Sequence, residues 1–197
     1  AASRACVSID TTSPAVAAAC LCAGACVVND VSCLRDGALA EVAAAAGAAL
    51  ILMHSRGVQG DMRGFSSYPE DAYGDVVRDV CDELIAAVDR ARAAGLPEGA
   101  IAVDPGLGFA KNARHSAELL ARLGEIVRAV GNPVVVGASR KSFLTLVDAG
   151  APAQDRLGAS IAAALHAARA GAALLRVHDV RATRQAVDID RSLRAAS

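Results

Sequence analysis

One unit of apolar and polar residues recurs along the chain: an Ala-rich helix, a glycine, a short apolar strand and then a polar residue. Its five copies read "PAVAAACLCAGACVVND", "ALAEVAAAAGAALILMH", "DELIAAVDRARAAGLPEGAIAVDP", "EIVRAVGNPVVVGAS" and "SIAAALHAARAGAALLRVHD". Each glycine stands where a helix ends in a left-handed residue, and each strand is a continuous apolar run, as parallel strands buried on both faces require. Together with the first apolar run, the pattern predicts six strands, near Val7, Val27, Leu50, Ala102, Val135 and Leu175.

Strands that alternate with helices indicate right-handed βαβ units and a parallel sheet, in either an open sheet or a barrel. A dinucleotide-binding sheet would carry a Gly-x-Gly-x-x-Gly turn after its first strand, where this chain has "SIDTTSPAV". Polar residues instead follow six successive strands: Asp10, Asn29, His54, Asp104, the Ser139 to Ser142 group, and Arg176 with His178. Because such strand ends meet at one mouth in a TIM barrel, we expect an α/β fold of the TIM (β/α)8 type. Residues 1–197 would form a single domain with six of the eight βα units.

Composition narrows the class of protein. The chain is 54% hydrophobic and 21% charged, with a net charge of -1, which is typical of a globular protein and gives no electrostatic basis for binding nucleic acid. No apolar run reaches the roughly 18 residues of a membrane helix, and no stretch resembles a signal peptide. We therefore expect a cytoplasmic protein. Because the chain does not begin with Met, its start is expected to be a processed end or a cut through a larger protein.

Five of the six cysteines fall within the first 33 residues, a spacing that raises a metal cluster or a disulfide scaffold as alternatives. Cys20 and Cys22 lie two apart on a predicted helix and so point in different directions. Cys6 and Cys26 lie in apolar strands, where a free cysteine behaves as a small hydrophobic residue. We expect ordinary core and surface cysteines.

Three strand-end residues, Asp10, Asn29 and Asp104, would supply carboxylate and amide groups that can pair with the edge of a polar heterocycle. A single Asp before Pro is more often a turn or cap residue, but three residues at corresponding places in the repeat favour a site. The Gly106 and Gly108 pair would let the backbone approach a ligand, and the neighbouring Phe109 could pack on a ring.

Cations follow the last two strands. Arg176 and His178 are two residues apart on a strand and so share a face, which suits an anion site, although a salt bridge to Asp179 or a neighbouring carboxylate is the alternative. Lys141 is one of only two lysines in the chain. It would contact a phosphate or a heteroatom, or form a Schiff base as in barrel aldolases, for which no acid or base partner is evident beside it.

These motifs carry a family resemblance. "VSIDTT", "VVNDVS", "LMHSRG", "DPGLGFAK", "VVVGASRKSF", "RLGASIAAALHAARAGA" and "LLRVHDV", in this order, resemble the dihydropteroate synthase family from about Val7 onward. The resemblance implies a magnesium-assisted reaction that joins 6-hydroxymethyl-7,8-dihydropterin diphosphate to 4-aminobenzoate and releases diphosphate. "SRKSF" with "RVHDV" is its most specific part.

The resemblance also implies roles for individual side chains. Residues that bind the pterin or line its slot would be Asp10, Asn29, Met53, Asp104, Phe109, Gly137, Lys141 and Arg176. Ser142 would lie near the aminobenzoate, and Arg176 with His178 would take the diphosphate. Lys141, Asp104 and Arg176 would carry the catalysis.

Departures from the family leave alternatives open. The family's first two βα units are absent, with an Asn that binds the metal and two loops that complete the aminobenzoate site, so the metal ligands here are unknown. Ser55 stands where Met is common, and the loop from Val58 to Tyr68 has no evident role. The chain could instead be a catalytically incomplete pterin-binding protein or fragment, or a pterin-binding methyltransferase domain that serves a corrinoid protein. We expect the isolated segment to be inactive, and a homodimer stays open.

Overall fold

The computed structural model describes residues 5–57 and 68–196, so most of the loop from Val58 to Tyr68 lies outside the described residues. The strands are β1 (Ser8–Asp10), β2 (Val27–Asp30), β3 (Ala49–Met53), β4 (Ile101–Asp104), β5 (Val135–Val136) and β6 (Leu174–Leu175). The α-helices are α1 (Pro14–Cys22), α2 (Ala38–Ala45), α3 (Val76–Ala93), α4 (Ala113–Ala121), α5 (Leu123–Val130), α6 (Leu157–Arg169) and α7 (Val180–Ala195). Short 3-10 turns are η2 (Glu98–Ala100), η3 (Ser142–Leu146) and η4 (Ala153–Asp155). The six predicted strands are confirmed.

All strand pairs are parallel. Strands β1 to β4 pair in chain order in one sheet, and β5 pairs with β6 in a second. A single bridge between Val103 and Val134 joins the two sheets, supported by the Val103 amide, which donates to the Pro133 carbonyl at 2.9 Å. Because neighbouring strands run in the same direction, their carboxyl ends all lie on one side of the molecule, as the parallel pattern predicts.

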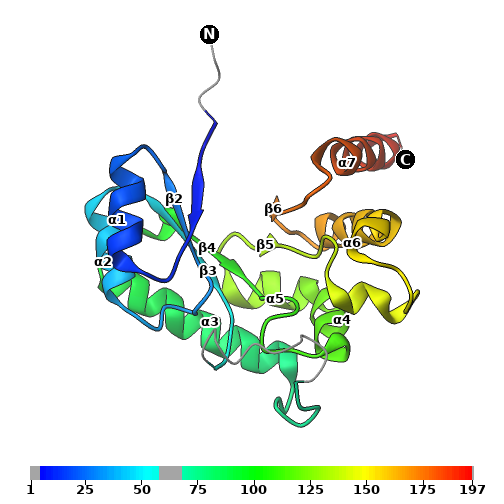
Figure 1. Cartoon of the computed structure of the whole chain (residues 1–197), viewed down its shortest axis with the longest axis horizontal. Coiled ribbons are helices and arrows are strands. Elements are labelled where there is room, and N and C mark those ends of the chain that lie inside the picture. Colours follow the sequence, from blue (N-terminus) through cyan, green and yellow to red (C-terminus); the bar gives the residue numbers. More distant parts are fainter. Residues whose placement is uncertain (1–4, 58–67, 197) are drawn as a thin grey trace.

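The helices form an arc around the strands (Figure 1). In this view α1 and α2 lie on one side, α3, α4 and α5 lie below, and α6 with α7 lie on the other side. Among the described residues, no element covers the side between β1 and β6, and both strands are largely exposed edges. The structure therefore shows an α/β fold with parallel strands whose two outer edges do not pair with each other.

Left-handed glycines end the helices where the repeat predicts them. Positive φ angles occur at Gly24, Gly47, Gly95, Gly131 and Gly171, each of which stands between a helix and the next strand. Side-chain caps fix the opposite ends of several helices, because Ser13, Asp75 and Asn112 accept hydrogen bonds from amides in the first turn. Local signals of this kind explain why the sequence pattern locates these elements.

The apolar core lies between the helices and the sheet. Helix α3 shows how it is built: its apolar residues recur at helical spacing, so that Val80, Leu84 and Ala87 are fully buried while the opposite face is charged. Strands β3 and β4 pack Leu50, Leu52 and other apolar side chains into the same core. No helix among the described residues combines the length and the apolar character needed to cross a membrane.

The prediction of ordinary cysteines is wrong for one pair. Cys6 and Cys26 form a disulfide, with a Cα to Cα distance of 6.2 Å. Both residues lie just ahead of adjacent strands, and the register that places Ser8 beside Val27 also brings the two cysteines together. Spacing along the sequence does not reveal this register, because it is set by strand pairing. The remaining four cysteines are free.

Candidate active site

Asp104 is the last residue of β4 and lies on the strand-end side of the molecule. Its side chain is almost fully covered and accepts a hydrogen bond of 2.7 Å from the Gly106 amide. Burial raises the pKa of this carboxyl, while Lys141, the Gly106 hydrogen bond, Lys111 and Arg176 oppose the shift. A buried carboxylate facing several cations is well placed to accept hydrogen bonds from a ligand.

Lys141 follows β5 and turns back towards Asp104. Its ammonium group donates to the Leu107 carbonyl and lies 4.7 Å from the centre of the Phe109 ring, a cation–π distance. Burial lowers the pKa of Lys141 to about 8, with Asp104 acting in the opposite direction and Arg176 adding to the decrease. The residue is therefore charged at neutral pH, but less firmly than an exposed lysine.

The neighbouring cation, Arg140, has a different role. It has a positive φ of 60°, and its guanidinium forms an ion pair of 2.7 Å with Asp179. Its amide donates to the Ser160 hydroxyl at 2.9 Å, and its carbonyl accepts from Arg156 at the same distance. Of the two adjacent cations after β5, Arg140 thus fixes the loop, while Lys141 faces the candidate site.

Gly137 marks the place where three charged residues converge. A Cβ atom built on this glycine would lie 3.9 Å from the Arg176 Cβ, 3.9 Å from an Asp104 carboxylate oxygen and 4.0 Å from the Lys141 Nζ. These residues come from three different strand ends. With no side chain at position 137, the backbone leaves room between an anion and two cations, which suits a flat polar ligand.

Asp10 and Asn29 complete this side of the site. The Asn29 side-chain amide donates to one Asp10 oxygen at 3.0 Å, and Arg176 forms an ion pair with the other. Arg176 therefore forms the salt bridge that was the alternative expectation, with Asp10 as its partner. Asp179 pairs with Arg140 instead. Since Asp10 and Arg176 are both about half exposed, their pair costs little to exchange for a ligand contact.

His178 and Ser142 lie at a separate hollow beside Lys141. The Ser139 hydroxyl lies 3.0 Å from the His178 Nδ1, which orients the imidazole. A pocket of about 480 Å³ is lined by Gly108, Phe109, Ser139, Arg140, Lys141, Ser142, Ala153, Arg156 and His178. Cations therefore surround a space next to the polar groups at Gly137. Met53 adjoins from β3, buried and in register with Asp104.

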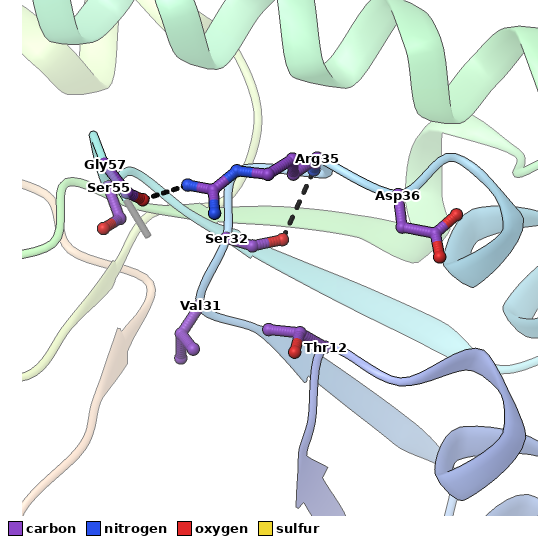
Figure 2. A pocket seen from close by; sticks show the side chains of 7 residues that line it. All are labelled: Thr12, Val31, Ser32, Arg35, Asp36, Ser55 and Gly57. Atoms are coloured by element: carbon purple, nitrogen blue, oxygen red, sulfur yellow. Dashed lines mark hydrogen bonds between the residues drawn. The ribbon is translucent and has the colours of Figure 1, made fainter. Parts of the chain in front are cut away.

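A smaller pocket of about 200 Å³ lies past the ends of β1, β2 and β3 (Figure 2). Arg35 crosses it and donates to the Gly57 carbonyl, while the Ser32 hydroxyl accepts from the Arg35 amide at 3.3 Å. Ser55, at the position where Met is common, also lines this space, and its buried hydroxyl has no hydrogen-bond partner within the described part of the chain. None of the predicted site residues lines the pocket, and we assign it no role in the reaction.

Comparison with known proteins matches residues 1–178 to the family described as pterin binding enzyme. The chain therefore belongs to the pterin-binding enzyme family. It is 46% identical over 189 residues to the dihydropteroate synthase of Mycobacterium leprae, an alignment that covers 93% of this chain and 65% of the relative. The chain thus spans slightly less than two thirds of that curated relative.

Solved structures agree with this assignment to the pterin-binding enzymes. Dihydropteroate synthase from Stenotrophomonas maltophilia superposes with a TM-score of 0.91 at 36% identity, covering 99% of this chain and 71% of that one. The enzyme from Thermus thermophilus, in complex with 4-aminobenzoate, gives a TM-score of 0.86 at 41% identity, with 95% and 74% covered. The same enzyme has also been solved in complex with 6HMPPP.

One strand-end residue does not face the mouth as expected in this pterin-binding enzyme. His54 is fully buried, and its Nε2 lies 2.9 Å from a Glu83 oxygen, while Arg56 binds the other Glu83 oxygen. Burial, reinforced by Lys111, lowers the pKa of His54 to about 4, so the imidazole is neutral at pH 7. Its place at a strand end predicted that the side chain faces the mouth, but the imidazole points beneath the strand ends instead.

Sequence reasoning also missed Lys111, the second lysine of the chain. This side chain is fully buried and lies 2.8 Å from the His54 Nδ1. The available signal was the scarcity of lysine, which drew attention to Lys141 only. The position of Lys111 at the end of "GFAK" gave no indication that its side chain turns under the strand ends.

Proposed function

We propose that this chain carries the pterin and diphosphate portion of a dihydropteroate synthase site. The reaction would join 6-hydroxymethyl-7,8-dihydropterin diphosphate to 4-aminobenzoate, giving 7,8-dihydropteroate and diphosphate. The observation that carries the proposal is the convergence of Asp104, Lys141 and Arg176 on the bare backbone of Gly137. The 4-aminobenzoate and 6HMPPP complexes of the T. thermophilus relative support the choice of substrates.

Recognition of the pterin would use groups of opposite hydrogen-bonding character. The Asp104 carboxylate would accept hydrogen bonds from the donor edge of the ring, and Lys141 would donate to a ring heteroatom. Asn29 offers its amide oxygen, because its amide nitrogen already donates to Asp10. The Phe109 ring and the buried Met53 would bound the slot. These roles make Asp104 and Lys141 the central binding groups.

Arg176 and His178 would bind the diphosphate as it leaves. In the reaction the bond between the pterin methylene carbon and the diphosphate oxygen breaks, and the diphosphate leaves with the electron pair. The amine of 4-aminobenzoate then forms the new C–N bond and loses a proton. Arg176 would exchange its exposed Asp10 partner for the leaving group, whose charge grows as the bond breaks. Ser142, beside Lys141 in the larger pocket, would lie near the incoming amine.

The magnesium ion implied by the resemblance does not fit a ready donor set here. Within residues 5–57 and 68–196, no three Asp, Glu, His or Cys side chains gather as metal ligands. We therefore assign no step to a metal.

We further propose that the parallel strands are six of the eight units of a TIM-type barrel, in one domain spanning 1–197. The unpaired outer edges of β1 and β6 support this, because a closed barrel has no edges. In this arrangement two further units would fill the side between β1 and β6. Loops from those units would complete the aminobenzoate site, so we expect no turnover from this chain on its own.

The test measures diphosphate release from the pterin substrate with and without 4-aminobenzoate. A protein that contains this chain together with the remaining barrel units should release diphosphate only when the amine is present, and should form 7,8-dihydropteroate in equal amount. Release that ignores the amine would contradict the synthase and favour a pterin-binding protein of another kind. Turnover by the 197-residue chain alone would contradict the need for further units.

A further inference from the structure

Lys111 lies beneath the candidate pterin site, on the opposite side of the 105–110 turn from Lys141. Its Nζ donates to the Phe109 carbonyl at 3.0 Å and to the His54 Nδ1 at 2.8 Å. Since His54 accepts at Nδ1, its Nε2 carries the hydrogen and donates to Glu83. A fully buried ammonium is costly, and these hydrogen-bond partners offset part of that cost.

The turn above Lys111 is fixed from both sides. The two lysines of the chain donate to two of its carbonyls, Lys111 to Phe109 and Lys141 to Leu107. Gly106 donates its amide to Asp104, and a Cβ atom there would lie only 2.0 Å from the His54 carbonyl oxygen and 3.4 Å from the Lys111 Nζ. The turn thus rests directly on the end of β3 and on the buried ammonium.

We propose that Lys111 is a positioning residue of the pterin site, which holds the 105–110 turn against the end of β3 and keeps a second positive charge beneath Asp104. The inference rests on the proposed function, because the ligand that benefits is the pterin. Lys111 would not touch the pterin. It would act through the Asp104 carboxylate and through the placement of Phe109 and the Leu107 carbonyl.

The electrostatic part of the inference follows from the groups that face each charge. Those facing Asp104 are Lys141, Lys111 and Arg176. Those facing Lys111 are Asp104, Lys141, Cys33 and Glu83, with His54 in direct contact and the centre of the Tyr73 ring 6.0 Å from the Lys111 Nζ. Burial lowers the pKa of Lys111 to about 7, and Asp104 gives the largest opposing effect. Each of the two buried groups therefore favours the charged form of the other.

The experiment compares binding of 6-hydroxymethyl-7,8-dihydropterin, which lacks phosphates, across pH in the intact protein. Lys111→Met should weaken binding at pH 7 by about tenfold. It should also move the loss of binding at acid pH upwards by about one pH unit, because Asp104 loses a neighbouring cation and protonates more easily. Lys111→Arg keeps the charge, so the acid limb of the pH profile, where binding is lost as the pH falls, should stay in place.

Tyr73→Phe is the matched control. The Tyr73 hydroxyl donates to the Ala110 carbonyl at 2.9 Å, so this change removes a neutral hydrogen bond from the same turn. It should leave the acid limb where it is in the unchanged protein. An acid limb that Lys111→Met does not move, or that Tyr73→Phe moves equally, would overturn the inference. Failure of the unchanged protein to bind the pterin would count against the proposed function instead.

A second measurement covers the case in which Lys111→Met does not fold. The ε-carbon of Lys111 can be followed by NMR in protein labelled with ¹³C-lysine, with its signal assigned from the Lys111→Arg variant. Asp104→Asn should lower the pKa of Lys111, because the carboxylate that favours the ammonium is lost. An unchanged Lys111 titration in this variant would show that the two groups are not coupled and would overturn the inference.

Discussion

The two sides of the 105–110 turn use the same kinds of residue and differ in what surrounds them. On the mouth side, the half-buried Lys141 faces Asp104 across the open backbone of Gly137. On the underside, the fully buried Lys111 has His54 and the Phe109 carbonyl as partners. A lysine at the mouth has space beside it for a ligand, whereas the lysine beneath is enclosed by protein groups. Residue type and strand-end position therefore do not separate a ligand site from its support, but burial and hydrogen-bond partners do.

The largest contrast between the two sides is expected at their glycines. Gly106→Ala should destabilise the fold by about 3 kcal/mol or more, because the new methyl group would overlap the His54 carbonyl and φ is +69°. Gly137→Ala meets only ordinary contacts of 3.9 to 4.0 Å, so unfolding should change by no more than about 1 kcal/mol.

The effect of Gly137→Ala should be larger on pterin binding than on stability. The methyl group of Gly137→Ala would occupy the floor of the site and weaken the pterin by about tenfold or more, with the fold intact. Urea unfolding and pterin titration of both variants make the comparison. Similar stability losses at the two glycines would show that the mouth side is packed as closely as the underside.

Lys141→Ala tests whether the mouth lysine acts by binding or by covalent chemistry. Pterin affinity should fall by about tenfold to a hundredfold, whether or not the ligand carries phosphates, because a charge-assisted hydrogen bond to the ring is lost. Borohydride should trap no imine in the unchanged protein. A trapped adduct that disappears in Lys141→Ala would revive the aldolase alternative.

Arg176→Ala should affect only the phosphate-bearing ligand. The pterin diphosphate should bind about tenfold to a hundredfold more weakly, since the guanidinium is assigned to the leaving group. The pterin alcohol should keep its affinity, apart from a small effect of freeing Asp10. Arg184→Ala, which removes an exposed arginine paired with Asp188 on α7, is the control. Equal losses for both ligands would assign Arg176 to the ring or to the structure.

The repeated pattern predicted the fold well because its signals are local. Continuous apolar runs and left-handed glycines such as Gly24 and Gly131 fix where strands begin and helices end, whatever the rest of the chain does. The same reasoning placed Asp104, Lys141 and Arg176 near one another, because parallel strands end on one side. The six-strand count follows from these features alone.

What the sequence could not supply is the direction of side chains after a strand ends. Met53 is the register partner of Asp104, and His54 follows one residue later. The His54 amide donates to the Asp104 carbonyl at 2.8 Å, and its imidazole turns under the sheet towards Glu83. The direction of the His54 imidazole depends on two partners far away in the sequence, which are Glu83 on α3 and Lys111 after β4. The disulfide between Cys6 and Cys26 was missed for the same reason, because strand register is a long-range property.

The smallest expected effect is a difference in pH dependence between the two sides. Burial holds the pKa of Lys141 near 8, so pterin affinity should fall by no more than about tenfold as pH rises from 7 to 9 and the ammonium becomes a weaker donor. Lys141→Arg stays charged over this range. Its pH profile should keep only the contribution of Lys111 and of the ligand, so the difference between the two profiles isolates Lys141.

Stability should move in the opposite direction over a neighbouring range. Because the folded pKa of Lys141 lies below its ordinary value of 10.5, the unfolded chain binds more protons between about pH 8 and 10.5. Raising the pH through this window should therefore increase the free energy of unfolding, while pterin binding declines. Lys141→Arg should lose only the part of this rise that comes from Lys141, while the larger part due to Lys111, whose window begins near pH 7, should remain. Chemical unfolding at pH 7.5 and 9.5 gives the measurement. Parallel changes of stability and affinity would mean that Lys141 supports the fold rather than the ligand, and the contrast between the two lysines would fail.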